Sequence, residues 1–287
     1  MLEPALTEIN TLFQRYHIHD QIVGIQRLSG TTDGVVFKLK SAQDRIYILK
    51  YDSPYQIALV EQLLRTYEHS FLLPKIISTA DDKTNLIYTY IDGTTHFNRG
   101  KKQDWLTLLA KELLNKYVKY EDASSWGRIE YPRNTWKEFN EISIEEAKVN
   151  IGSILTDEDY HFVRLQVNKL FNNITEQEDR YFLHGDTGVH NFVYKQSSLV
   201  GVIDPSPMIG PIIYDFLYAF CSSPDDLNVE TLFAAYDHLE QGKIERNRLI
   251  DEVSVQLYCR IGLSIKHHPN DLPEYLAAWD YWKAAIE

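Results

Sequence analysis

The chain has 287 residues, 44% of them hydrophobic and 24% charged, which is the composition of a globular protein with a sizeable core. Its formal net charge of −12 argues against a nucleic-acid-binding surface, because such a surface needs clustered Lys and Arg to displace counterions from phosphates. The two cysteines, Cys221 and Cys259, have no metal-ligand spacing and do not suggest a disulfide framework.

Neither a secretory segment nor a membrane span is expected. Residues 1–13 lack the basic start and the apolar core of a signal peptide, and no apolar run reaches the length of a bilayer span. We therefore expect a cytoplasmic protein with no membrane partner. Its acidic surface would tolerate a cationic ligand, although many intracellular enzymes are equally acidic.

The N-terminal part of the sequence has mostly the pattern of short strands. An amphipathic helix is predicted first, over 3–16. Ser53 and Pro54 are typical of a helix N-terminus, and the helix that they begin should run to about Glu68. Strands are predicted at 22–28, 35–39, 45–50, 72–77 and 86–91.

Two features of this part could bind phosphate. The turn after the first strand contains Ser29, Gly30, Thr31 and Thr32, and a glycine-containing hairpin can bring backbone N–H groups close to phosphates. An ordinary hairpin turn has the same composition. Lys50 ends the third strand, where it is either a phosphate ligand or a solvated lysine at the strand end.

Helical spacing of apolar residues dominates from Asp104 onward. Residues 120–131 interrupt it with serine and glycine and are predicted to form a loop. A further helix is predicted to begin at Phe216, and three more helical segments follow up to Ile286. Before Phe216, helices are predicted at 136–149 and 158–171.

The most informative stretch lies between 181 and 204. Short strands are predicted at 181–183, 192–194 and 199–203, the last two forming a hairpin. This arrangement brings Asp186, Asn191 and Asp204 to one rim. Carboxylate and amide oxygens at such a rim can hold Mg²⁺ and accept a proton, which is what magnesium-assisted phosphoryl transfer requires. Asp and Asn taken singly are also common turn-capping residues, so the catalytic interpretation depends on the three together.

The sequence His-Gly-Asp at 184–186, Asn191 five residues after Asp186, and a strand ending in Asp204 resembles the aminoglycoside phosphotransferase and choline kinase group of small-molecule kinases. The resemblance implies a bilobal, protein-kinase-like α+β fold. Residues 1–92 would form an N-terminal nucleotide-binding lobe with an antiparallel sheet and one main helix. Residues 93–287 would form a larger, mostly helical lobe that carries the catalytic and acceptor-binding residues.

The same resemblance implies roles for residues of the motif. Asp186 would be the catalytic base that accepts the proton of the substrate hydroxyl. Asn191 and Asp204 would hold Mg²⁺ against the phosphates of ATP or GTP. His184 would brace the loop, and Asp215 would anchor it from beneath.

In the N-terminal lobe, the resemblance implies that Lys50 contacts the nucleotide phosphates and pairs with Glu61, with Glu68 as the alternative partner. The backbone of residues 88–91 would bind the purine, as the hinge does in the related kinases. The cofactor-binding residues implied are Lys50, Glu61, Ser29, Gly30, Thr31, Thr32, Tyr88, Tyr90 and Ile91.

We therefore expect transfer of the γ-phosphate of ATP or GTP to a hydroxyl of a small molecule. An aminoglycoside acceptor would make the protein an antibiotic-resistance enzyme, whereas choline, homoserine or a sugar-type alcohol would make it a metabolic kinase. A non-catalytic nucleotide-binding protein of kinase fold is the alternative from another class. The sequence leaves the oligomeric state open. Acidic residues that slightly favour a cationic acceptor are Asp225, Asp226, Glu230 and Asp237.

Overall fold

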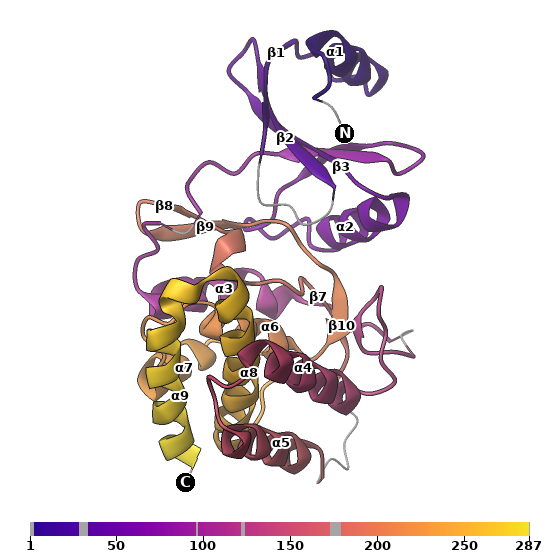
Figure 1. The fold of residues 1–287 in the computed structure, drawn as a ribbon. Coiled ribbons are helices and arrows are strands. Elements are labelled where there is room, and N and C mark those ends of the chain that lie inside the picture. Colours follow the sequence, from indigo (N-terminus) through magenta and orange to yellow (C-terminus); the bar gives the residue numbers. More distant parts are fainter. Residues whose placement is uncertain (1–2, 29–33, 96, 122–123, 173–178, 287) are drawn as a thin grey trace. The chain divides into compact units, whose positions relative to one another are not determined.

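A computed structural model describes residues 3–28, 34–95, 97–121, 124–172 and 179–286 (Figure 1). The chain forms two compact units, which are described separately below. The first unit contains residues 1–93 and 200–203, and the second contains 94–199 and 204–287. None of the helices in the described ranges is both long and apolar enough to cross a membrane.

The first unit is built on a five-stranded antiparallel sheet with the strand order β1-β2-β3-β5-β4. Helix α1 (Leu6–Arg15) precedes the sheet, and α2 (Pro54–Thr66) follows β3. Ser53 caps α2, since its Oγ accepts the Gln56 N–H at 3.3 Å, as the sequence predicts. The strands are β1 (Ile22–Arg27), β2 (Val35–Ser41), β3 (Ile46–Tyr51), β4 (Ile76–Thr79) and β5 (Asn85–Thr89).

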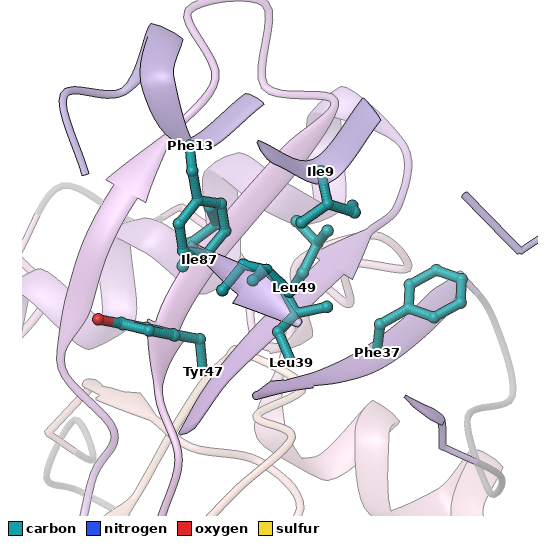
Figure 2. Close-up of a cluster of buried hydrophobic side chains, with 8 residues drawn as sticks. Ile9, Phe13, Phe37, Leu39, Tyr47, Leu49 and Ile87 are labelled. Carbon is teal, nitrogen blue, oxygen red and sulfur yellow. The ribbon is translucent and has the colours of Figure 1, made fainter. Parts of the chain in front are cut away.

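Helix α1 packs its apolar side onto one face of this sheet. Tyr47 and Leu49 alternate along β3 and both point to that face, so Ile48 and Lys50 point to the other one. Figure 2 shows the resulting core, which contains Ile9, Phe13, Phe37, Leu39, Tyr47, Leu49 and Ile87. Lys50 therefore lies on a strand whose opposite face packs into the core.

The strand predicted at 72–77 begins only at Ile76, so that prediction is wrong for its first residues. Pro74 has no N–H for a strand ladder, and residues 71–73 form a turn and bend instead. The backbone there is used differently, because the Leu72 carbonyl accepts the Val202 N–H at 2.7 Å.

Helices make up most of the second unit. Those before the central motif are α3 (Lys102–Glu112), α4 (Trp136–Ile151) and α5 (Asp157–Asn172). Those after it are α6 (Ile212–Cys221), α7 (Val229–Tyr236), α8 (Arg246–His267) and α9 (Leu272–Ile286). Short 3₁₀ turns lie at Leu114–Lys116, Val189–Asn191 and Pro269–Asp271.

Two small sheets carry the central motif. Strands β8 (Phe192–Lys195) and β9 (Ser198–Val202) form the predicted hairpin. Strand β7 (Tyr181–Leu183) lies in a three-stranded sheet of order β6-β10-β7, next to β10 (Met208–Gly210).

Two sequence predictions need correction in this unit. Part of the loop predicted at 120–131 is strand β6 (Gly127–Arg128), which pairs with β10 and is too short to leave a periodic pattern. Helix α6 begins at Ile212 rather than Phe216, directly after Pro211, so Asp215 lies in its first turn. The predicted α+β fold, with an antiparallel sheet followed by a mostly helical part, is confirmed.

Candidate active site

The loop 184–191 connects β7 to β8 and turns sharply at Gly185. Gly185 has φ 77°, a left-handed conformation that residues with a Cβ rarely adopt. A Cβ at this position would lie 2.1 Å from the carbonyl oxygen of Ser206. Both the backbone conformation and the lack of space therefore require glycine at position 185. The next residue after this turn is Asp186.

The two carboxylate oxygens of Asp186 have different surroundings. Oδ2 accepts a hydrogen bond from Asn191 Nδ2 at 2.9 Å and lies 3.3 Å from His190 Nε2. Asn191 Nδ2 also donates to the Asp186 carbonyl oxygen at 3.0 Å, which fixes the backbone of the loop. Oδ1 is buried and has no partner in the described part of the chain. Asp186 thus holds one oxygen in place and keeps the other available.

Asp186 is ionised at neutral pH. Burial acts to raise the pKa of its carboxyl group, but the hydrogen bond and charge of His190 and the charge of Arg128 outweigh it. The net effect is a pKa below the ordinary value. The side chain is 23% exposed, and because Oδ1 is buried this exposure belongs to its other atoms.

His184 is fully buried and shapes the loop. Its Nδ1 accepts the Asp186 N–H at 3.3 Å, and burial lowers the pKa of the imidazole to about 4. The ring is therefore neutral, and since Nδ1 is an acceptor the proton belongs on Nε2. The charges of Asp186 and Asp204 oppose the lowering of this pKa, which shows that both carboxylates lie near His184.

Asp215 supports the loop from the first turn of α6. Its fully buried carboxylate accepts hydrogen bonds from Tyr117 Oη at 2.6 Å and from the Gly185 N–H at 3.1 Å. The Asp215 carbonyl oxygen accepts the Thr187 hydroxyl at 2.7 Å. Burial raises the pKa of Asp215 to about 6, even though these hydrogen bonds act to lower it. Asp215 thus holds the loop where it turns.

The motif predicts Asp204 and Asn191 as metal ligands, and these roles stay predictions. Asp204 follows β9 and has φ 53°, an unusual backbone conformation for a residue with a side chain. Asn191 is 5% exposed, and its carboxamide oxygen has no partner among the described residues. The structure does not place a group of three or more His, Cys, Asp or Glu residues suited to a metal anywhere in those residues.

Arg128 was not predicted from the sequence. It lies on β6 opposite Met208, and its Nη1 donates to the Ser206 carbonyl oxygen at 3.0 Å and to the Ser206 hydroxyl. The same carbonyl oxygen limits the space at Gly185. No periodic pattern marks a strand of two residues, so nothing in the sequence pointed to this arginine.

A cavity of about 510 Å³ opens beside the loop, between β6, α4, α6 and α8. Arg128, Tyr214 and Tyr218 line it. A Cβ at Gly188 would lie 3.4 Å from Cε1 of Tyr218, so the wall of the cavity packs against the loop that carries Asp186. We call this space the α4–α8 cavity.

In the first unit, Lys50 and Glu61 are both buried. The Lys50 ammonium lies 3.8 Å from Asp52 Oδ2, and Glu61 accepts hydrogen bonds from Lys83 at 2.5 Å and from Arg65 Nε at 2.9 Å. Burial acts to raise the pKa of Glu61, but these bonds leave it below its ordinary value. The pairing of Lys50 with Glu61 stays a prediction. The other candidate, Glu68, is exposed.

The remaining predicted nucleotide-binding residues divide into two groups. Tyr88 lies on β5 opposite Ile48, while Tyr90 and Ile91 follow the end of the strand. The Lys38 ammonium stands 4.1 Å from the centroid of the Tyr90 ring, and the Ile91 side chain packs against Gly201. Ser29, Gly30, Thr31 and Thr32 lie outside the described residues.

Comparison with known proteins relates the chain to one fold. A scan against family models and a search of curated protein sequences both return no match. Among solved structures, the macrolide 2'-phosphotransferase of Brachybacterium faecium has a TM-score of 0.61 at 11% identity, over 96% of this chain and 97% of that one. An aminoglycoside phosphotransferase in complex with GDP and kanamycin has a TM-score of 0.59 at 13% identity, over 98% and 99%.

A candidate fructosamine-3-kinase of Thermobifida fusca is also similar, with a TM-score of 0.57 at 16% identity over 94% of this chain and 99% of that one. These likenesses extend over nearly the full length of each chain. The protein therefore has the protein-kinase-like fold of small-molecule phosphotransferases, which confirms for the fold the resemblance seen in the sequence.

Proposed function

We propose that the protein transfers the γ-phosphate of a nucleoside triphosphate to a hydroxyl of a small molecule, with Asp186 as the base. One observation carries the proposal. On a loop that Gly185 and Asp215 hold in place, Asp186 is ionised and has one buried oxygen without a partner in the described part of the chain. In the proposal, that oxygen accepts the hydroxyl proton when the acceptor is bound.

In the reaction, the acceptor hydroxyl oxygen forms a bond to the γ-phosphorus as the bond from that phosphorus to the β–γ bridging oxygen breaks. The nucleoside diphosphate leaves, and the hydroxyl proton passes to Asp186. Transfer of this kind needs alignment and charge neutralisation more than covalent chemistry. The hydrogen bond from Asn191 to Asp186 Oδ2 supplies the alignment on the protein side.

Mg²⁺ fits the donor groups of this site. Asn191 offers a carboxamide oxygen and Asp204 a carboxylate, and both are hard oxygen ligands. Mg²⁺ usually takes one or two protein oxygens of this kind and completes its coordination with substrate phosphates and water. Asn191 and Asp204 would hold the ion, and the bound ion would neutralise phosphate charge.

The first unit would supply the nucleotide site. Lys50 is a buried cation at the end of β3, suited to contact phosphates, and residues 88–91 offer backbone groups for a purine. Solved structures of the same fold contain GDP, ATP or ADP. ATP and GTP are therefore the donors to test. The prediction stands that backbone N–H groups of the turn lie close to the phosphates, and this turn contains Ser29, Gly30, Thr31 and Thr32.

The test is phosphate transfer by purified protein with Mg²⁺ and either ATP or GTP, over a panel of aminoglycosides, macrolides, choline, homoserine and sugars. We expect Asp186→Asn, which keeps the shape of the side chain, to lower the turnover by about 10²- to 10⁴-fold and to leave nucleotide affinity unchanged. Asp157→Asn is the matched control, because the side chain of Asp157 is 97% exposed in the same unit.

Transfer by the Asp186→Asn variant at the wild-type rate would remove Asp186 from the role of base. If the wild type binds nucleotide yet phosphorylates nothing in the panel, the non-catalytic nucleotide-binding alternative is favoured. Loss of turnover in both variants would point to misfolding, which the unchanged nucleotide affinity is designed to exclude.

A further inference from the structure

The α4–α8 cavity has one aromatic wall. The ring of Phe139 stacks on Trp136 with centroids 4.5 Å apart, and the Tyr214 ring meets both edge-on. Tyr218 continues this wall from Tyr214, with centroids 5.7 Å apart. Burial raises the pKa of both tyrosines well above the ordinary value, so their hydroxyls remain protonated hydrogen-bond donors. Flat apolar surface with hydroxyl groups at its edge suits a ring-shaped polyol.

The charged residues that line the cavity are two arginines and one glutamate. Arg128 Nη1 donates a hydrogen bond to the Ser206 carbonyl oxygen. Its other guanidinium nitrogens have no hydrogen-bond partner among the described residues. The side chain of Arg133 likewise has no bonding partner in those ranges. Glu146 is exposed at the cavity, and in the described chain it too has no bonded partner.

Neutral polar groups complete the lining, and they do not change this balance. Asn140, Asn150, Gln256 and Ser143 can each donate as well as accept hydrogen bonds. Cys259 also faces the cavity, but burial raises the pKa of its thiol to about 12, so it contributes no negative charge. The lining residues of the cavity therefore carry two positive charges and one negative charge, and the Asp186 and Asp215 carboxylates lie close enough to interact with the charge of Arg128.

The acidic residues that the sequence offered for a cationic acceptor do not line this cavity. Asp225 is paired with Arg99 at 3.1 Å, and Asp237 with Arg246 at 2.6 Å. Those two carboxylates are thus already neutralised by arginines of the protein. These ion pairs make a polycation such as kanamycin less favoured as the acceptor.

We infer that the α4–α8 cavity takes a hydroxylated ring that bears a carboxylate or another anionic group, with Arg133 as a specificity-determining residue. The inference rests on the proposed function for its meaning, because the ring would be the phosphate acceptor. The aromatic wall would cover one face of the ring, and the guanidinium of Arg133 would bind its negative group. The charge of Arg128 is instead engaged with the Asp186 and Asp215 carboxylates.

Binding can be tested without turnover. The probes are three p-nitrophenyl glycosides of the same size, namely the β-glucuronide, the β-glucoside and the 2-amino-2-deoxy-β-glucoside, which carry a negative, zero and positive charge. Calorimetry or ligand-observed NMR on the full chain gives their affinities. We expect the glucuronide to bind about tenfold more tightly than the amino sugar, with the glucoside between them.

Arg133→Gln should reduce that preference to about twofold or less, mainly by weakening the glucuronide. Glu146→Gln is the matched control, because it removes the opposite charge from the same cavity and should keep or increase the preference. A tighter complex with the amino sugar, an unchanged preference in the Arg133→Gln variant, or no binding of any probe up to about 10 mM would overturn the inference.

The same titrations with Asp186→Asn separate this inference from the proposed function. Glucuronide binding that persists in both proteins, without phosphate transfer by the wild type, would reject the kinase function and keep the assigned ligand class. Transfer to kanamycin in preference to the glucuronide would keep the kinase function and reject the ligand class.

Discussion

Asp186 combines a low pKa with a fixed orientation, and this combination bears on how it would act. A carboxylate whose pKa lies below the ordinary value is a weak base, so it would align the hydroxyl and take the proton late in the reaction. Asn191 and His190 contact Oδ2, and these contacts restrict the rotation of the carboxylate. Positioning is then the main contribution of this residue.

Gly185 offers a sharp test of how the loop is held. Alanine there would meet both the left-handed backbone and the Ser206 carbonyl at 2.1 Å, so we expect Gly185→Ala to destabilise the protein by about 3 kcal/mol or more and to abolish turnover. Gly152→Ala is the matched control, since Gly152 has φ 58° but no atom within 4 Å of the added Cβ. It should cost about 2 kcal/mol or less and leave turnover intact. Equal losses of stability in denaturant titrations would exclude the clash.

Asp215 predicts a dependence of stability on pH. Its pKa is raised from 3.8 to about 6 in the fold, so between these values the folded chain binds more protons than the unfolded chain. The contribution of Asp215 is therefore complete below about pH 4 and is lost as the pH rises through 6, by about 3 kcal/mol in all. Relative to wild type, Asp215→Asn should gain stability over this range. A difference in free energy of unfolding that is constant from pH 4 to 7 would contradict this.

The site residues differ in how visible they were in the sequence. Asp186, Asn191 and Asp204 were proposed as site residues because of their spacing along short strands that the structure contains, and their roles stay predictions. The positions of Arg128 and Tyr117 depend on pairing between segments far apart in the chain, such as Arg128 with Met208. A sequence pattern contains no signal for that pairing.

At the scale of elements, the long helices and the short strands β7, β8 and β9 were predicted, whereas β6 and β10 were missed. Helices α4 and α5 each have 16 residues, enough turns for an apolar stripe to repeat. Strands β6 and β10 have two and three residues and gain their stability from each other and from β7. These two short strands nevertheless place Arg128 and Ser206 at the site.

Helices α4 and α8 pack closely together at Gly262. A Cβ there would lie 2.9 Å from the Ala147 Cα atom, so Gly262→Ala should push the two helices apart and reshape the cavity between them. We expect a loss of about 1–2 kcal/mol, because overpacking outweighs the better helix propensity of alanine. Acceptor affinity should fall while nucleotide affinity stays the same.

The control for that change is Val149→Ala on α4, since Val149 is 82% exposed and should tolerate substitution within about 0.5 kcal/mol. Denaturant unfolding and acceptor titrations give both quantities. Unchanged acceptor binding in the Gly262→Ala variant, despite a measurable loss of stability, would show that the helix spacing does not set the shape of the cavity.

For the whole molecule, net charge does not by itself identify the ligand. The chain has 41 acidic and 29 basic residues, which is compatible with a cationic acceptor but does not require one. Two acidic residues that supported this suggestion are bound by arginines, while Arg128 and Arg133 line the cavity. Charge summed over a sequence describes long-range potential and solubility, whereas recognition depends on the few groups at a site.

The first unit is discontinuous in sequence, because it takes residues 200–203 from the middle of the chain. Within it, Val202 donates its N–H to the Leu72 carbonyl and Gly201 packs against Ile91. A gene fragment that stops after residue 93 would leave that carbonyl and that side chain uncovered. An engineer who exchanges this first unit between proteins of the same fold would therefore have to graft two separate segments, and the second ends one residue before Asp204.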